Sequence, residues 1–180
     1  MSDDRLAFIL RSPALVERVV RAVLHEALRS RRYQSGALEV RAFASAALSE
    51  LERIAAATRL DTDAIGRLEL QNSTVNAAGC FASSALARRL FAIPAERFRA
   101  VPAEVDAAVL DARERIHLIR LELVTSGAAR SELARAIARL LPPPRSSTHL
   151  PQLHFLSLRD GQLRSIGEIE TTAADAKRSA

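Results

Sequence analysis

The feature that most constrains the fold is a segment, Leu60 to Ala92, with residues suited to helix packing spaced alternately three and four apart. They are Ile65, Leu68, Asn72, Val75, Gly79, Ala82 and Leu86. Such spacing puts side chains on one face of an α-helix, so the segment is expected to be one continuous helix packed against others along this seam. Asn72 would then be a polar group in the seam, where it could fix helix register, line a polar site or face a partner chain.

The composition supports helices over sheets. Hydrophobic residues make up 48% of the 180 residues, yet the aromatic residues are only six Phe and one Tyr. A core built mainly from Ala, Leu, Val and Ile favours close helix packing. The expected fold class is therefore all-α.

Further helices are expected from about residue 12 to 32, from 37 to 58, and from Pro102 onward. The Pro102 segment also alternates four and three, through Val105, Val109, Ala112, Ile116, Ile119 and Leu123. A shorter helical piece is expected over 128–141. Because the connections are short, neighbouring helices should run antiparallel. Residues 1–141 thus predict a bundle of four main helices.

The chain changes character after residue 141. Residues 142–152 are a proline-rich linker, 153–169 predict an extended arm or β-hairpin with Asp160 and Gly161 in its turn, and 170–180 are expected to be a disordered tail. An isolated hairpin is marginally stable in water. The arm should therefore lie on the bundle, join a partner's sheet, or become ordered when a partner binds.

No motif for catalysis, cofactor or metal stands out. His25, His117, His149 and His154 lack the spacing of metal ligands, and no glycine-rich phosphate-binding loop is present. Cys80, beside small residues, is interpreted as a packed small hydrophobe. We therefore expect no enzyme activity, no cofactor and no metal.

The preferred functional hypothesis is a protein–protein interaction or assembly module. The arm would add strand edges to a partner, which is another protein of unknown identity or a second copy of this chain. Phe155, Leu156 and Leu158 on the arm, together with Asn72, are the candidate contact residues.

The alternative hypothesis is nucleic-acid binding through arginine-rich helix faces. Arg18, Arg21, Arg29 and Arg32 recur at helical spacing, and Arg113 and Arg120 repeat the pattern on the Pro102 segment. Nearby glutamates, such as Glu17 and Glu26, would partly neutralise these faces. A degenerate helix-turn-helix over 64–86, with its turn at Glu69, is weighed against a continuous helix, and the uninterrupted seam favours the helix.

The sequence indicates a cytoplasmic protein. Cys80 is the single cysteine, which rules out an internal disulfide and suits a reducing compartment. No apolar run approaches the roughly 18 residues that a membrane span requires, and the acidic start of the chain does not resemble a secretory signal. We expect no membrane partner.

Overall fold

The computed structural model describes residues 3–30, 39–58, 60, 62–99, 105–123, 127–140 and 151–168. The fold is mixed α/β, so the all-α prediction is wrong. The chain divides into two compact units, which we call the helical unit and the sheet unit. The helical unit comprises residues 1–92, 122–124 and 157–162, and the sheet unit comprises residues 93–121, 125–156 and 163–180.

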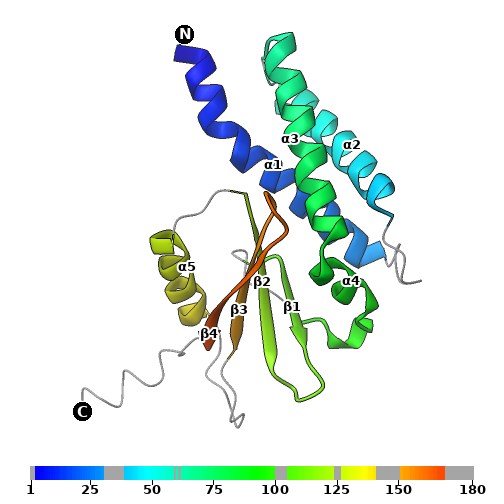
Figure 1. Cartoon of the computed structure of the whole chain (residues 1–180), viewed down its shortest axis with the longest axis vertical. Helices are drawn as coiled ribbons and strands as arrows, with labels where there is room; N and C mark the ends of the chain where they lie inside the picture. Colours follow the sequence, from blue (N-terminus) through cyan, green and yellow to red (C-terminus); the bar gives the residue numbers. More distant parts are fainter. Residues whose placement is uncertain are drawn as a thin grey trace. The chain divides into compact units, whose positions relative to one another are not determined.

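The helical unit contains α1 (Asp3–Ser30), α2 (Val40–Thr58), α3 (Ala64–Ser83) and α4 (Ala85–Ala92) (Figure 1). Phe81 lies at the centre of its core, with its ring centroid 5.1 Å from that of Phe43 and 6.5 Å from that of Phe91. The helical unit also includes the end of β2 and the turn between β3 and β4. There, the Leu123 backbone N–H donates to Glu17 Oε1 at 2.7 Å.

The first two helices confirm much of the predicted pattern. Apolar side chains at helical spacing are buried on both helices: Val16, Val19, Val20 and Val23 on α1, and Phe43, Ala47, Leu51 and Ile54 on α2. Val40, at the start of α2, is 40% exposed. Helix α1 begins at Asp3 and contains Pro13, although the sequence predicted a helix start at Ser12. Proline is common in the first turn of a helix, so Pro13 directly after Ser12 predicts a helix start at Ser12 that the structure does not have.

Helix α3 is continuous through Glu69, which confirms a helix in place of a helix-turn-helix at this position. Asp63 caps its start, since its side chain accepts a hydrogen bond from the Gly66 backbone N–H at 2.7 Å. The expected helix over Leu60 to Ala92 is nevertheless two helices. Ser84 interrupts it, and its hydroxyl accepts a hydrogen bond from the Ala87 backbone N–H at 3.0 Å, which caps α4.

The face of α3 expected to pack inward is the wrong one. The buried residues are Gly66, Leu70, Thr74, Ala77, Ala78, Phe81 and Ala82. By contrast, Ile65 is 57% exposed, Leu68 is 58% exposed, and Asn72 is exposed as well. Thr74 can be buried because its hydroxyl donates to the Leu70 carbonyl at 2.8 Å.

The sheet unit contains a four-stranded mixed sheet in the order β1 (Ala107–Leu110), β2 (Ile116–Glu122), β3 (Gln152–Ser157) and β4 (Leu163–Glu168). Strands β1 and β2 are antiparallel, as are β3 and β4. The predicted β-hairpin is confirmed, and Gly161 in its turn has a φ of +69°. Its strands belong to the chain's own sheet and do not form a separate arm.

The fourth predicted helix is wrong, because its residues form β1, β2 and the turn between them. Asp111 builds this turn, since its Oδ1 accepts from the backbone N–H groups of Arg113, at 2.8 Å, and Arg115, at 2.9 Å. Glu114 adopts a φ of +61°. The turn therefore forms without glycine or proline, and its Ala, Arg and Glu residues look helical in the sequence.

Helix α5 (Gly127–Leu140), which connects β2 to β3, packs on one face of the sheet (Figure 1). The shared core contains Val105, Ala108, Leu118, Ala134, Ile137, Leu153 and Phe155. The Arg130 guanidinium lies 5.8 Å from the centre of the Phe155 ring, a cation–π contact. The expected linker, apart from Pro151 and Gln152, and the expected tail over 170–180 lie outside the residues that the structure describes.

Candidate functional sites

The outer face of α3, which we define as Ile65, Leu68, Asn72 and Val75, is an exposed surface with apolar side chains. Val75 is 36% exposed, and the two other apolar residues are more exposed. The spacing of three, four and three places these residues opposite the buried face of the helix. One turn further along lies Gly79, where an added Cβ atom would meet nothing within 4 Å. Helix α3 is therefore apolar on two opposite faces, of which one is buried in its own unit.

The structure brings the other predicted partner contacts into the interior. Phe155, Leu156 and Leu158 are each at most 1% exposed, so their side chains are not available at the surface. Asn72 differs from them, because it is exposed and lies in the middle of the outer face of α3. Of the predicted partner-binding residues, only Asn72 is thus placed where a partner could reach it.

The predicted arginine faces are divided among different environments. Arg21 forms an ion pair with Glu17 at 2.9 Å, and Arg29 forms one with Glu26. Arg18 is exposed, and Arg32 lies outside the described residues. These pairs reduce the positive charge that α1 could offer to phosphate groups.

Arg113 and Arg120 do not share a helix face. Arg113 is exposed in the turn after β1, whereas Arg120 lies in β2 with its Nη1 atom 3.8 Å from Asp106 Oδ1. The basic stripe expected on a fourth helix is absent, because that helix does not form. Nucleic-acid binding stays a prediction that no contact in the described part of the chain supports directly.

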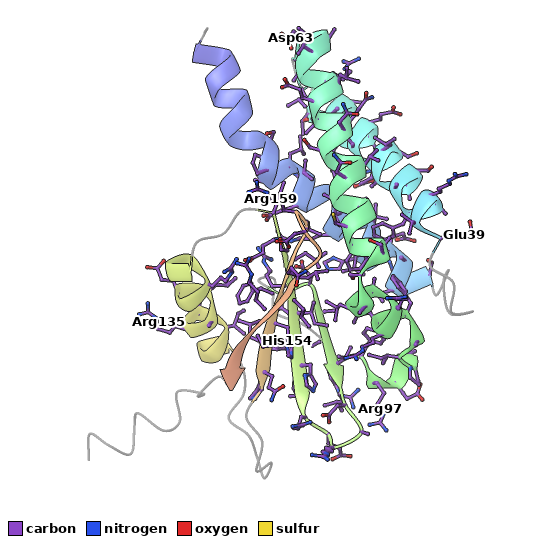
Figure 2. All side chains as sticks on the ribbon, viewed as in Figure 1. Glu39, Asp63, Arg97, Arg135, His154 and Arg159 are labelled. Atoms are coloured by element: carbon purple, nitrogen blue, oxygen red, sulfur yellow. The ribbon has the colours of Figure 1, made fainter. Side chains whose placement is uncertain are left out.

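Two histidines meet on the sheet, although they are far apart in the sequence. His117 on β2 and His154 on β3 have their Nδ1 and Nε2 atoms 2.9 Å apart and their ring centroids 5.2 Å apart. Side chains alternate along a strand, and Leu118, Leu153 and Phe155 point toward α5. The two histidines therefore lie on the opposite face of the sheet from α5. Figure 2 labels His154.

Each histidine has a further polar partner. His117 Nε2 lies 3.3 Å from Asp111 Oδ2, and His154 Nδ1 lies 2.8 Å from Ser165 Oγ. Asp111 also accepts a hydrogen bond from Arg115 Nε at 2.8 Å. This cluster could not be found from the sequence, because its members come from separate parts of the sheet and the segment that contains His117 fits a helical spacing.

Burial and hydrogen bonding shift two pKa values in this cluster. Burial by itself would raise the pKa of Asp111, but hydrogen bonds from Arg115, His117 and the Arg113 backbone together bring it well below its usual value. Burial, and secondly the neighbouring His117, lowers the pKa of His154. Near neutral pH, Asp111 is therefore ionised and His154 is neutral.

Cys80 is partly buried, with its Sγ atom 3.5 Å from the Arg159 carbonyl oxygen. Among the residues with described positions, no group of three or more His, Cys, Asp or Glu is arranged to hold a metal ion. None of the described helices is both long enough and apolar enough to span a membrane.

The chain was compared with family models, curated proteins and solved structures, and none of the three comparisons gave a match.

Proposed function

We propose that this chain is a protein–protein interaction or assembly module that pairs with a second copy of itself through the outer face of α3. The observation that carries the proposal is the exposure of Ile65 and Leu68, at 57% and 58%, on a helix whose opposite face is already buried. A helix that is apolar on both sides usually has both sides covered. Covering this surface would remove apolar area from water, which favours association.

A second copy is the occupant that best fits this surface. Residues spaced three and four apart form the seam by which two helices interlock, and a single Asn within such a seam specifies pairing. In a two-fold pair centred on Asn72, the two amide groups would meet and satisfy each other, whichever way the helices run. The open space around Gly79 would let the two helices approach closely.

The experiment that tests this proposal is the mass of the full chain in solution, measured by analytical ultracentrifugation over a range of concentrations. We expect a dimer for the natural sequence. Leu68→Glu should weaken the dimer at least about tenfold, because it places a charge in the apolar contact.

Ser73→Glu is the matched control, since Ser73 is exposed on the same helix but lies off the outer face of α3. It adds the same charge and should leave the dimer intact. Circular dichroism should show the same helix content in both variants. A natural chain that is monomeric at all concentrations, or a Leu68→Glu chain that pairs as tightly as the natural one, would overturn the proposal.

A further inference from the structure

Four polar side chains form a continuous chain of hydrogen bonds across the sheet. The chain runs from Asp111 through His117 and His154 to Ser165, with successive distances of 3.3, 2.9 and 2.8 Å. Asp111 follows β1, and the three other residues come from β2, β3 and β4 in order. Ser165 is exposed and the others are partly buried, so a reagent in solution can reach the serine end.

The ionised Asp111 sets the direction of each of these three hydrogen bonds. Because a carboxylate only accepts, His117 donates to it from Nε2; with both rings neutral, His117 Nδ1 is then an acceptor. His154 then donates from Nε2, which leaves His154 Nδ1 without a hydrogen and able to accept one. The Ser165 hydroxyl therefore donates to His154 Nδ1, so the nitrogen that can accept the Ser165 proton is already hydrogen-bonded to it.

We propose that Ser165 is a nucleophile that takes an acyl group from a carboxylic ester, with His154 as its general base. The Ser165 oxygen attacks the carbonyl carbon while its proton passes to His154 Nδ1. When the carbon–oxygen bond to the alcohol breaks, the alcohol leaves with that proton. The products are acyl-Ser165 and a free alcohol, and the step needs no oxidant or reductant.

His117 and Asp111 act in this step as positioning residues. The His154 ring, once protonated at Nδ1, carries a positive charge, and its Nε2 hydrogen bond to His117 keeps it oriented toward Ser165. Asp111 holds the His117 tautomer that makes this bond possible, and its negative charge favours the protonated pair. This site does not depend on the proposed pairing through α3, because the four residues all belong to the sheet unit.

The test uses p-nitrophenyl acetate on the full chain, with the acetylated residue located by peptide mapping and mass spectrometry. We expect Ser165 to be acetylated about 100-fold faster than Ser83, the advantage that a general base typically provides. Ser83 is a suitable internal control, since it is exposed and its hydroxyl donates to the Gly79 carbonyl at 2.7 Å, an oxygen that cannot act as a general base. Comparable acetylation of the two serines would overturn the proposal.

Two variants separate chemistry from folding. Ser165→Ala should lose this acetylation with no change in thermal unfolding, because the Ser165 side chain is exposed. His154→Gln should slow acetylation of Ser165 about 100-fold while its circular dichroism spectrum stays that of the natural chain. If His154→Gln is folded and is acetylated at Ser165 as fast as the natural chain, His154 is not the base and the proposal fails.

The pH profile of the acetylation rate tests the positioning residues. On the sheet, His154 faces His117 from β2 and Ser165 from β4, with Asp111 and Arg115 beyond His117. The rate should fall as acid protonates His154, with a midpoint below the usual 6.5. Asp111→Asn should shift this midpoint, whereas an Asp111 role confined to folding would leave it unchanged.

Discussion

Asp106 and Leu121 are joined by a buried hydrogen bond, in which the Leu121 backbone N–H donates to Asp106 Oδ2 at 2.7 Å. Asp106 is 3% exposed, and its own backbone N–H donates to the Ile119 carbonyl at 2.8 Å. The carboxylate thus replaces a backbone acceptor just before β1, where the regular ladder with β2 begins. An acidic residue is buried here because it satisfies a buried backbone donor.

Removal of this carboxylate should destabilise the sheet unit. Asp106→Ala leaves the Leu121 N–H without its acceptor, which should lower the free energy of unfolding by about 1–3 kcal/mol. Asp106→Asn retains an oxygen acceptor and should cost less than Asp106→Ala. Urea unfolding followed by circular dichroism measures both variants, and equal losses would show that this hydrogen bond does not account for the burial of Asp106.

Residue periodicity predicted helical structure in the helical unit but not the side on which α3 packs. Spacing of three and four identifies a face, yet α3 carries small residues such as Gly66, Ala77 and Ala78 on its other face. Small residues allow neighbouring helices to approach, and Thr74 can be buried because it bonds to its own backbone. The spacing therefore assigned Ile65, Leu68 and Val75 to the core, whereas the structure buries Leu70 and Phe81 together with the small residues.

The strands β1 and β2 were missed for a different reason. Val109 and Ile116 fit a helical spacing only when the intervening turn is counted as helix. The turn depends on one side chain, Asp111, and on a left-handed Glu114, neither of which the sequence distinguishes from helix. The hairpin of β3 and β4 was predicted correctly, because Asp160 and Gly161 form a recognisable turn.

The histidine pair could not be predicted from local spacing. His117 and His154 are 37 residues apart, and α5 lies between them in the chain. Their contact depends on which strands become neighbours and in what register. Only a correct sheet topology would have placed the two histidines together, and the all-α prediction contained no such sheet.

Asn72 should control how copies of this chain pair, if the proposed function holds. Asn72→Leu removes the polar group from the outer face of α3 and should tighten self-association, while the loss of register should produce species larger than a dimer. Ser73→Leu adds the same side chain off that face and should change neither property. Analytical ultracentrifugation distinguishes these outcomes, and an unchanged single dimer for Asn72→Leu would contradict the role given to Asn72.

Stability should fall with acid in two pH windows. The pKa of His154 is lower in the folded chain than its usual 6.5, so its contribution to stability is present above that pH and decreases as pH falls below it. The pKa of Asp111 is lower than its usual 3.8, so its contribution decreases only below that pH. Urea midpoints measured from pH 7 downward should therefore decline first through His154 and then through Asp111.

Single substitutions can assign these windows. His154→Gln should flatten the decline just below pH 6.5, and Asp111→Asn should flatten it below pH 3.8, since neither new side chain titrates there. A decline that is equally steep in a variant and in the natural chain would show that the pKa of the replaced residue does not differ between the folded and unfolded chain.

The turn between β3 and β4 should tolerate only some replacements of Gly161. Its φ of +69° is left-handed, and an added Cβ atom would lie 3.5 Å from the Cys80 carbonyl oxygen, an ordinary contact distance. Backbone strain, and not crowding by Cys80, should therefore determine how much a replacement of Gly161 lowers the free energy of unfolding. Gly161→Val should lower the free energy of unfolding by about 1–2 kcal/mol, whereas Gly161→Asn should cost less because asparagine adopts this conformation more readily. Thermal and urea unfolding of the two variants measure the difference, and equal costs would point to the Cys80 contact as the constraint.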